Sequence, residues 1–331
     1  MDIKLNNNKK RLYNNFKKLF KILLPILIGL FCVVYSFKKI SFSDFSQYFT
    51  KINYLWVSAG IMLGALSHIS RSYRWKFLIE PLGYKLGFIN STLTVFSAYL
   101  INYTIPRAGD VARGTMISKY EKIPFEKAIG TIVAERVIDI LCIILIIIIG
   151  LITEFNRISE ELFSIISTLN LSSILFIIIS FFLISFFLFL FLSRFNIYKK
   201  IISFFRGLSD GLMVIFKMKK RNEFILHTMF IWLMYILMFY VTSKAFSELH
   251  EIGFLQLMIS FTLAALSIVF SNGGIGIYPL AVEESLGWYG VQSATGLAFG
   301  WVMWLSQTMM VIIFGGLSLF ILPFINRNKS I

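Results

Sequence analysis

The sequence predicts an all-α, polytopic integral membrane protein with about six full spans and two re-entrant helical segments that could be related by inverted pseudo-symmetry. Of the 331 residues, 57% are hydrophobic and the mean hydropathy is +0.77, whereas a soluble domain is roughly 45–50% apolar. Several apolar runs reach about 18 residues, which is long enough to cross a bilayer as a helix. The alternating polar and apolar residues of membrane barrel strands are absent. These three observations favour a helical membrane fold.

The chain divides into two short tails and one long apolar region. Residues 1–18 are polar and basic, which suits a cytoplasmic tail on the membrane surface. Residues 19–325 form the predicted transmembrane domain, and residues 326–331 form a second cytoplasmic tail. The apolar segments expected to enter the membrane, in order, are 19–37, 54–69, 88–105, 128–152, 171–192, 224–241, 254–270 and 294–324.

Basic residues predict which loops face the cytoplasm, because Lys and Arg concentrate on that side of the membrane. The loops on both sides of segment 88–105 are basic, so this segment is expected to enter from the cytoplasm and return. A cytoplasmic C-terminus likewise requires segment 254–270 to return from the outer side. Pro106 breaks the first segment and the glycines of SNGGIG break the second. The alternative is eight plain spans with a weak charge bias.

The net charge of +15 indicates attraction to anionic lipid, because the basic residues lie mainly in the loops between apolar segments. We therefore expect a multi-pass protein of the inner (cytoplasmic) membrane with both termini cytoplasmic, and no nucleic-acid partner. Cys32 and Cys142 both lie in apolar runs, so neither a disulfide framework nor a metal site is expected. No nucleotide loop, metal carboxylate pair or nucleophile beside a histidine is found, so we expect no enzyme activity and no cofactor.

Six charged residues inside or beside apolar segments are the main candidate substrate-binding residues. They are Arg107, Asp110, Arg113, Glu135, Arg136 and Asp139. The first three are spaced i, i+3, i+6, and Glu135 and Asp139 are spaced i, i+4, so each set lies along one helix face. A charged side chain within the hydrocarbon costs about 3 kcal/mol on insertion scales. Each group therefore needs a partner, water or a ligand.

The six charges sum to zero, which leaves two interpretations open. In the first, they neutralise one another in a closed structural network, because a buried charge must be paired. In the second, the network opens to a ligand: arginine forks bind phosphate and a carboxylate holds an amine. The second interpretation predicts a site for a zwitterionic or anionic phospholipid headgroup.

Other residues extend this candidate site. Arg71 and Arg74 follow the second apolar segment, where they either mark its cytoplasmic end, the interpretation we favour, or belong to an entrance for phosphate. A break at the glycine-rich turn would leave a helix end whose backbone N–H groups point at a bound anion. Its candidate binding residues are Asn272, Gly273, Gly274 and Gly276. Glu283 and Glu284 are expected in a solvated loop, with a role in receiving a cationic headgroup as the alternative.

Four stretches carry a resemblance to a known family. IPRAGDVAR (105–113) followed by AERVIDI (134–140) resembles the signature of the flippase-like transmembrane region of lysylphosphatidylglycerol synthases. RSYRWKFL (71–78) resembles the arginine-rich exit from an early helix of that family. NGGIGIYPLAVEESLGWYGV (272–291) resembles its glycine-rich late segment. The likeness extends over most of the chain, from about residue 15 to about residue 325.

The resemblance implies a lipid-translocating membrane domain with re-entrant segments. Full-length members carry a cytosolic aminoacyl-transferase domain that this chain lacks, so synthesis of the aminoacylated lipid is not expected. Pro279, Trp301 and Trp304 depart from residues frequent in the family. These departures leave open which lipid is bound and whether transport is retained. The expected function is to bind a polar lipid and move it between leaflets. The alternatives are a membrane-embedded transferase acting on a lipid-linked substrate, and a non-catalytic partner of a separate lipid synthase; a homo-oligomer is also left open.

Overall fold

The computed structural model describes residues 23–39, 42–105, 108–168 and 218–327, with scattered positions between 170 and 186. These described residues are helical with no strand, which confirms the predicted all-α polytopic membrane fold. The chain divides into two compact units. The first consists of Met1–Ile132 together with Asn222–Ile331, and the second of Val133–Arg221.

One helical hairpin of the first unit is formed by α4 (Phe88–Thr104) and α5 (Ala108–Glu121). At the turn, the backbone N–H of Gly109 donates to Oδ1 of Asn102 at 2.8 Å. At the open end, Nδ2 of Asn90 donates to Oε1 of Glu121 at 2.6 Å. The chain therefore returns along α4 to the end at which it started, close to the position that the sequence predicted for a break.

A second hairpin is formed by α11 (Phe254–Ser267) and α12 (Ile277–Gly287), joined through the short helices η3 (Ile268–Phe270) and η4 (Asn272–Gly274). The reversal uses left-handed backbone at Gly273, Gly274 and Gly276, with φ of 63°, 78° and 71°. Glycine adopts these angles without the steric cost that other residues meet. The glycine-rich stretch is thus the tip of this hairpin.

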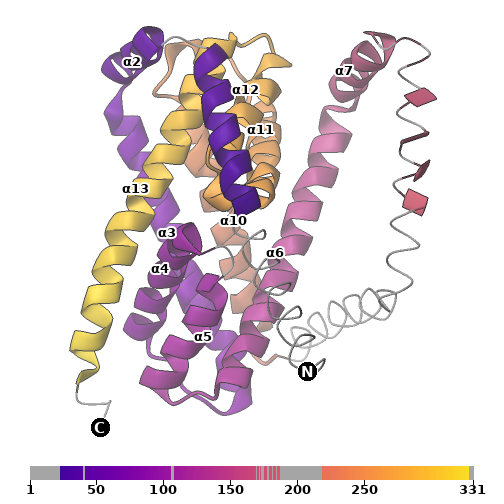
Figure 1. The fold of residues 1–331 in the computed structure, drawn as a ribbon. Coiled ribbons are helices and arrows are strands. Elements are labelled where there is room, and N and C mark those ends of the chain that lie inside the picture. Colours follow the sequence, from indigo (N-terminus) through magenta and orange to yellow (C-terminus); the bar gives the residue numbers. More distant parts are fainter. Residues whose placement is uncertain are drawn as a thin grey trace, which may run out of the picture. The chain divides into compact units, whose positions relative to one another are not determined.

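The tips of the two hairpins meet. A Cβ atom on Gly273 would lie only 2.8 Å from the ring of Tyr103, at the end of α4. Figure 1 shows α4 and α5 in the lower half of the first unit and α11 and α12 in its upper half. The two breaks that the sequence predicted are therefore neighbours inside the unit.

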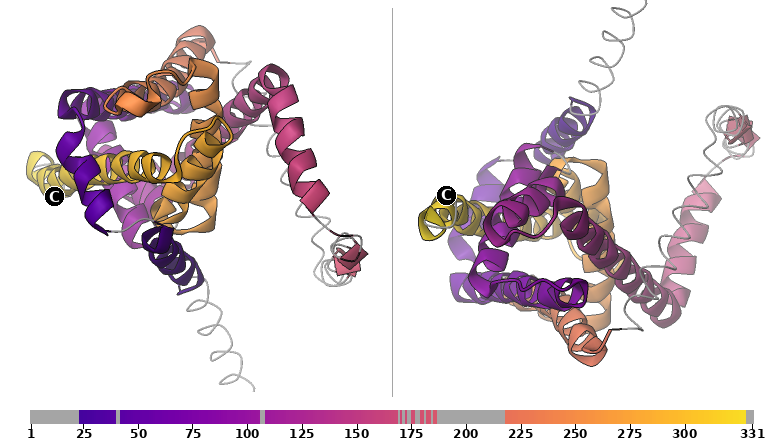
Figure 2. Two further views of the ribbon diagram at one scale, coloured as in Figure 1. Left: turned by 90° about the horizontal axis from the view of Figure 1, so that it is seen from above. Right: turned by 90° about the horizontal axis from the view of Figure 1, so that it is seen from below.

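Long helices run beside these hairpins: α3 (Tyr54–Ile79), α10 (Arg221–Ser243) and α13 (Ser293–Ile325). α13 packs against α12, α4, α3 and α2 (Phe42–Lys51), and the end-on views show it passing between other helices before its last turns reach the edge (Figure 2). Close approach to α12 needs a glycine on α13, since a Cβ at Gly300 would lie 2.6 Å from Cα of Pro279. Small residues at such contacts are typical of membrane helices.

The remaining elements are short, apart from α6. They are η1 (Glu80–Leu82), α6 (Phe125–Thr153), α7 (Phe155–Thr168) and η2 (Ser247–Leu249). Within the described residues, α6, α10 and α13 are each long and apolar enough to cross a membrane. The pair α2–α3, bent by 88°, could be a fourth, broken span. The predicted tail at residues 1–18 and most of the predicted segment 171–192 lie outside the described residues, so the count of six spans stays a prediction.

Candidate functional site

Arg71 and Arg74 lie inside a helix, not at its exposed exit. α3 continues to Ile79, ten residues beyond the expected end of the apolar segment at Ile69. The side chains of Arg71 and Arg74 are 3% and 0% exposed. Both side chains are thus packed against other parts of the protein. Whether they mark the cytoplasmic end of the segment or belong to an entrance for phosphate stays a prediction.

Trp75 links these arginines to a third one on α5. The Trp75 side chain is fully buried, and its Nε1 donates to Oγ1 of Thr131 at 2.9 Å. The guanidinium carbon of Arg113, a residue that is 2% exposed, lies 3.7 Å from the centre of the Trp75 ring. A guanidinium that lies on an aromatic ring keeps its N–H groups directed outward in its own plane. Arg113 of α5 is thereby fixed against α3 at Trp75.

Arg74 is held from the opposite side by α10. Its Nη1 donates to Oγ1 of Thr228 at 2.8 Å, and its guanidinium carbon lies 5.2 Å from the ring centre of Phe224. We call Arg71, Arg74, Trp75 and Arg113 the arginine cluster. All three guanidiniums are buried, and electrostatic contacts are stronger in such a place of low dielectric constant than in water. Arginine is a residue type whose planar fork suits phosphate oxygens.

The other predicted charges are distributed over both units. Asp110 lies half-buried in the first turn of α5, while Arg107 lies outside the described residues. Glu135, Arg136 and Asp139 belong to the part of α6 in the second unit, where Nη1 of Arg136 lies 3.6 Å from Oδ2 of Asp139. The structure thus places Arg113 on Trp75, which follows Arg74 directly on α3 and lies one helical turn after Arg71. The meeting of these arginines with the charges of α6 stays a prediction.

The glycine turn is a packed element. Nε1 of Trp304 donates to the carbonyl of Gly273 at 2.8 Å. The N–H of Gly274 donates to the carbonyl of Ser271, and that of Ile277 to the carbonyl of Ile275. Backbone N–H groups that already donate within the turn are less available to an anion. The predicted role of Gly273, Gly274, Gly276 and Asn272 in binding therefore stays a prediction, and the side chain of Asn272 lies outside the described part.

The same turn lies directly on helix 23–39. A Cβ on Gly276 would be 2.7 Å from the backbone nitrogen of Val33, and one on Gly29 would be 2.5 Å from Cγ2 of Ile275. On the side of the turn that faces α13, Trp304 holds the turn through its hydrogen bond to Gly273. Trp304 departs from the residue frequent in the family at this position, and in this chain it has a structural role.

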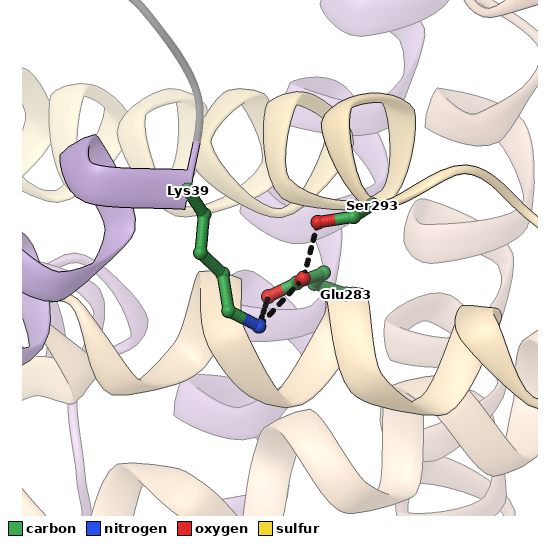
Figure 3. Close-up of polar contacts among 3 residues, drawn as sticks. All are labelled: Lys39, Glu283 and Ser293. Atoms are coloured by element: carbon green, nitrogen blue, oxygen red, sulfur yellow. Dashed lines mark hydrogen bonds and ion pairs between the residues drawn. The ribbon is translucent and has the colours of Figure 1, made fainter.

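A partly buried ion pair was missed by sequence reasoning. Glu283 lies on α12 with 6% exposure, and Nζ of Lys39 lies 2.8 Å and 3.0 Å from its two carboxylate oxygens. The hydroxyl of Ser293 donates to the same carboxylate (Figure 3). The expectation of a solvated loop at Glu283 and Glu284 is therefore wrong: both residues lie in a helix, and only Glu284 is exposed. No local pattern indicates the pair, because its two residues are 244 positions apart.

Comparison with known proteins agrees with this fold. The model of the family described as the lysylphosphatidylglycerol synthase TM region matches residues 22–315. The chain is 38% identical over 87 residues to a UPF0104 membrane protein of Methanocaldococcus jannaschii, which covers 25% of this chain and 26% of that relative. The chain thus matches about a quarter of that relative's length. No solved structure matches the chain.

The family match includes both hairpins, α3, α10, most of α13 and the arginine cluster. It confirms the resemblance noted in the sequence. From its match over residues 22–315, the chain belongs to the family of lysylphosphatidylglycerol synthase transmembrane regions.

Proposed function

We propose that the protein binds the phosphate of a phospholipid headgroup at the arginine cluster and moves that lipid between the two leaflets of the cytoplasmic membrane. The observation that carries this proposal is the burial of Arg71, Arg74 and Arg113 around Trp75 within one unit. Purely structural arginines are usually placed at helix ends, where the head group reaches the interface. Ionisable residues deep within a membrane protein are typically functional.

Each part of the cluster has a distinct role in this proposal. Arg113 is oriented by the ring of Trp75, and Arg74 by the hydroxyl of Thr228. Arginines held in a fixed geometry bind an anion at a lower entropic cost than flexible ones. The carboxylates Glu135 and Asp139 would take the amine of a zwitterionic or aminoacylated headgroup if α6 brings them to the cluster.

The hairpins supply the route. In the proposal α4–α5 and α11–α12 are re-entrant, each entering from one face of the membrane and returning to it. Broken helices that enter from opposite faces and meet at depth are the arrangement of many transporters, which expose a midplane site to each side in turn. The contact between Tyr103 and Gly273 is then the point at which the two halves separate or close. No enzyme activity is needed for this function.

Leaflet-specific transport in vesicles tests the proposal. Purified protein is reconstituted with a fluorescent phosphatidylglycerol, and a membrane-impermeant quencher reports the lipid that reaches the outer leaflet. Arg113→Lys keeps the charge but loses the flat ring contact, so we expect transport to fall about tenfold. Arg221→Lys, at an exposed arginine on α10, serves as the matched control and should leave transport unchanged.

Equal transport by the Arg113→Lys variant and the unchanged protein would remove the arginine cluster from the function. Transport that appears only after a lipid synthase is added would favour the partner hypothesis instead. Formation of a new lipid product by the purified protein would favour the transferase.

A further inference from the structure

A groove separate from the arginine cluster opens on the first unit between α3, α4 and α10. Its volume is about 460 Å³, within the range of small-molecule sites. Apolar side chains form most of its wall, namely Leu66, Ile69, Tyr73, Phe88, Leu226 and Phe230. Leu66, Phe88 and Leu226 are 43%, 47% and 67% exposed. In a chain embedded in a bilayer, such exposed apolar side chains face hydrocarbon.

One polar pair lies in this apolar wall and is already satisfied. Oγ of Ser70 and Nδ1 of His227 lie 2.8 Å apart. The ring of His227 also packs against Tyr73, with ring centres 4.9 Å apart. Because these polar atoms are paired with each other, the groove presents a largely apolar surface to whatever occupies it.

Cations lie at the edge of the groove. Nζ of Lys76 lies 3.4 Å from the ring centre of Tyr73, a residue that lines the groove. On α10, His227 lines the groove and its neighbour Thr228 holds Arg74. One end of an apolar groove therefore adjoins a lysine and, behind the wall, the arginine cluster. This combination is complementary to a molecule with a hydrocarbon chain and an anionic head.

We infer that the groove holds one acyl chain of an anionic glycerophospholipid, with the phosphate passing Lys76 on its way to the arginine cluster. The inference rests on the proposed function and names its substrate class: a lipid recognised through a chain as well as through its phosphate. The chain would enter sideways from the bilayer between α3 and α10, and its head would reach the arginine cluster along α3. Ser70 and His227 would lie beside the ester region of the lipid.

Photo-crosslinking tests the groove directly. The probe is a phosphatidylglycerol with a diazirine in one acyl chain, mixed into phosphatidylcholine vesicles that contain the purified protein. Mass spectrometry of the digested protein then locates the labelled residues. We expect labelling to concentrate on residues 66–73 and 226–230. Leu226→Trp should reduce this labelling about fivefold, because a bulky ring fills the groove.

Met229→Trp is the matched control, because Met229 lies on the same helix with 66% exposure, against 67% for Leu226, and does not line the groove. It should keep the wild-type labelling. A diacylglycerol with the same diazirine chain lacks the phosphate, and its labelling should be weaker and insensitive to Lys76→Gln. Labelling that maps elsewhere, or that Leu226→Trp leaves unchanged, overturns the inference. Groove labelling without transport would support the groove and reject the proposed function.

Discussion

Gly276→Ala is expected to destabilise the protein by about 3 kcal/mol, the largest effect that we predict for a single added methyl group. Two costs add at this position. The φ of 71° is a left-handed conformation that L-residues adopt with strain. In addition, the new Cβ would lie 2.7 Å from the backbone nitrogen of Val33 and 2.8 Å from the carbonyl oxygen of Gly29. Backbone atoms of a packed helix cannot rotate away as a side chain would.

Substitutions at two other glycines separate the cost of backbone strain from the cost of the close contact. Gly290 has a φ of 80° but open space around it, so Gly290→Ala should cost about 1–2 kcal/mol from strain alone. Gly287 is helical with open space, so Gly287→Ala should be neutral or slightly stabilising. The apparent melting temperature of the detergent-solubilised protein gives the ranking. If Gly276→Ala and Gly290→Ala have the same melting temperature, the contact of Gly276 with helix 23–39 adds no cost to the strain.

Glu283→Gln is expected to destabilise the protein by about 2 kcal/mol, because it leaves the ammonium of Lys39 beside a neutral amide. The loss is smaller than the 3–5 kcal/mol of fully buried pairs, since the side chain of Lys39 is 29% exposed and partly screened by solvent. Ser293 still has an acceptor in the amide oxygen. Thermal unfolding of the purified variant measures the effect.

Glu284→Gln is the matched control, because the neighbouring carboxylate is exposed, and it should change stability by less than about 0.5 kcal/mol. A double variant, Lys39→Met with Glu283→Leu, should recover most of the loss, because apolar replacement of both partners removes the unpaired charge. Equal effects of Glu283→Gln and Glu284→Gln would show that the ion pair contributes nothing measurable.

Hydrophobic length and the position of helix breakers predicted much of the architecture. The hairpin turns lie near Pro106 and at the glycines of residues 273–276, because proline disfavours helical backbone at the residue before it and glycine permits the left-handed backbone of a reversal. The burial of Arg71 and Arg74 could not be predicted in this way. It depends on packing against residues far away in the sequence, such as Thr228.

The candidate site was predicted in part. Arg113 was selected because a charge next to apolar sequence needs a partner, and it is indeed buried. The role of Trp75 could not be predicted from the residues next to it in the sequence, because its ring contacts Arg113 of another helix. The pair of Lys39 and Glu283 was missed for the same reason. Long-range pairing depends on the fold, whereas apolar length and chain breakers act locally.

The unequal lengths of the helices have a consequence for the surrounding lipid. At 1.5 Å per residue, α13 extends about 50 Å, whereas the two arms of the second hairpin, 14 and 11 residues long, extend only about 21 Å and 16 Å. A hydrocarbon core of about 30 Å exceeds both arms, so neither arm crosses it alone, whereas α13 is long enough to cross it with a tilt. Acyl-chain length in the host bilayer should therefore act mainly on α13, whose tilt should increase in thin membranes.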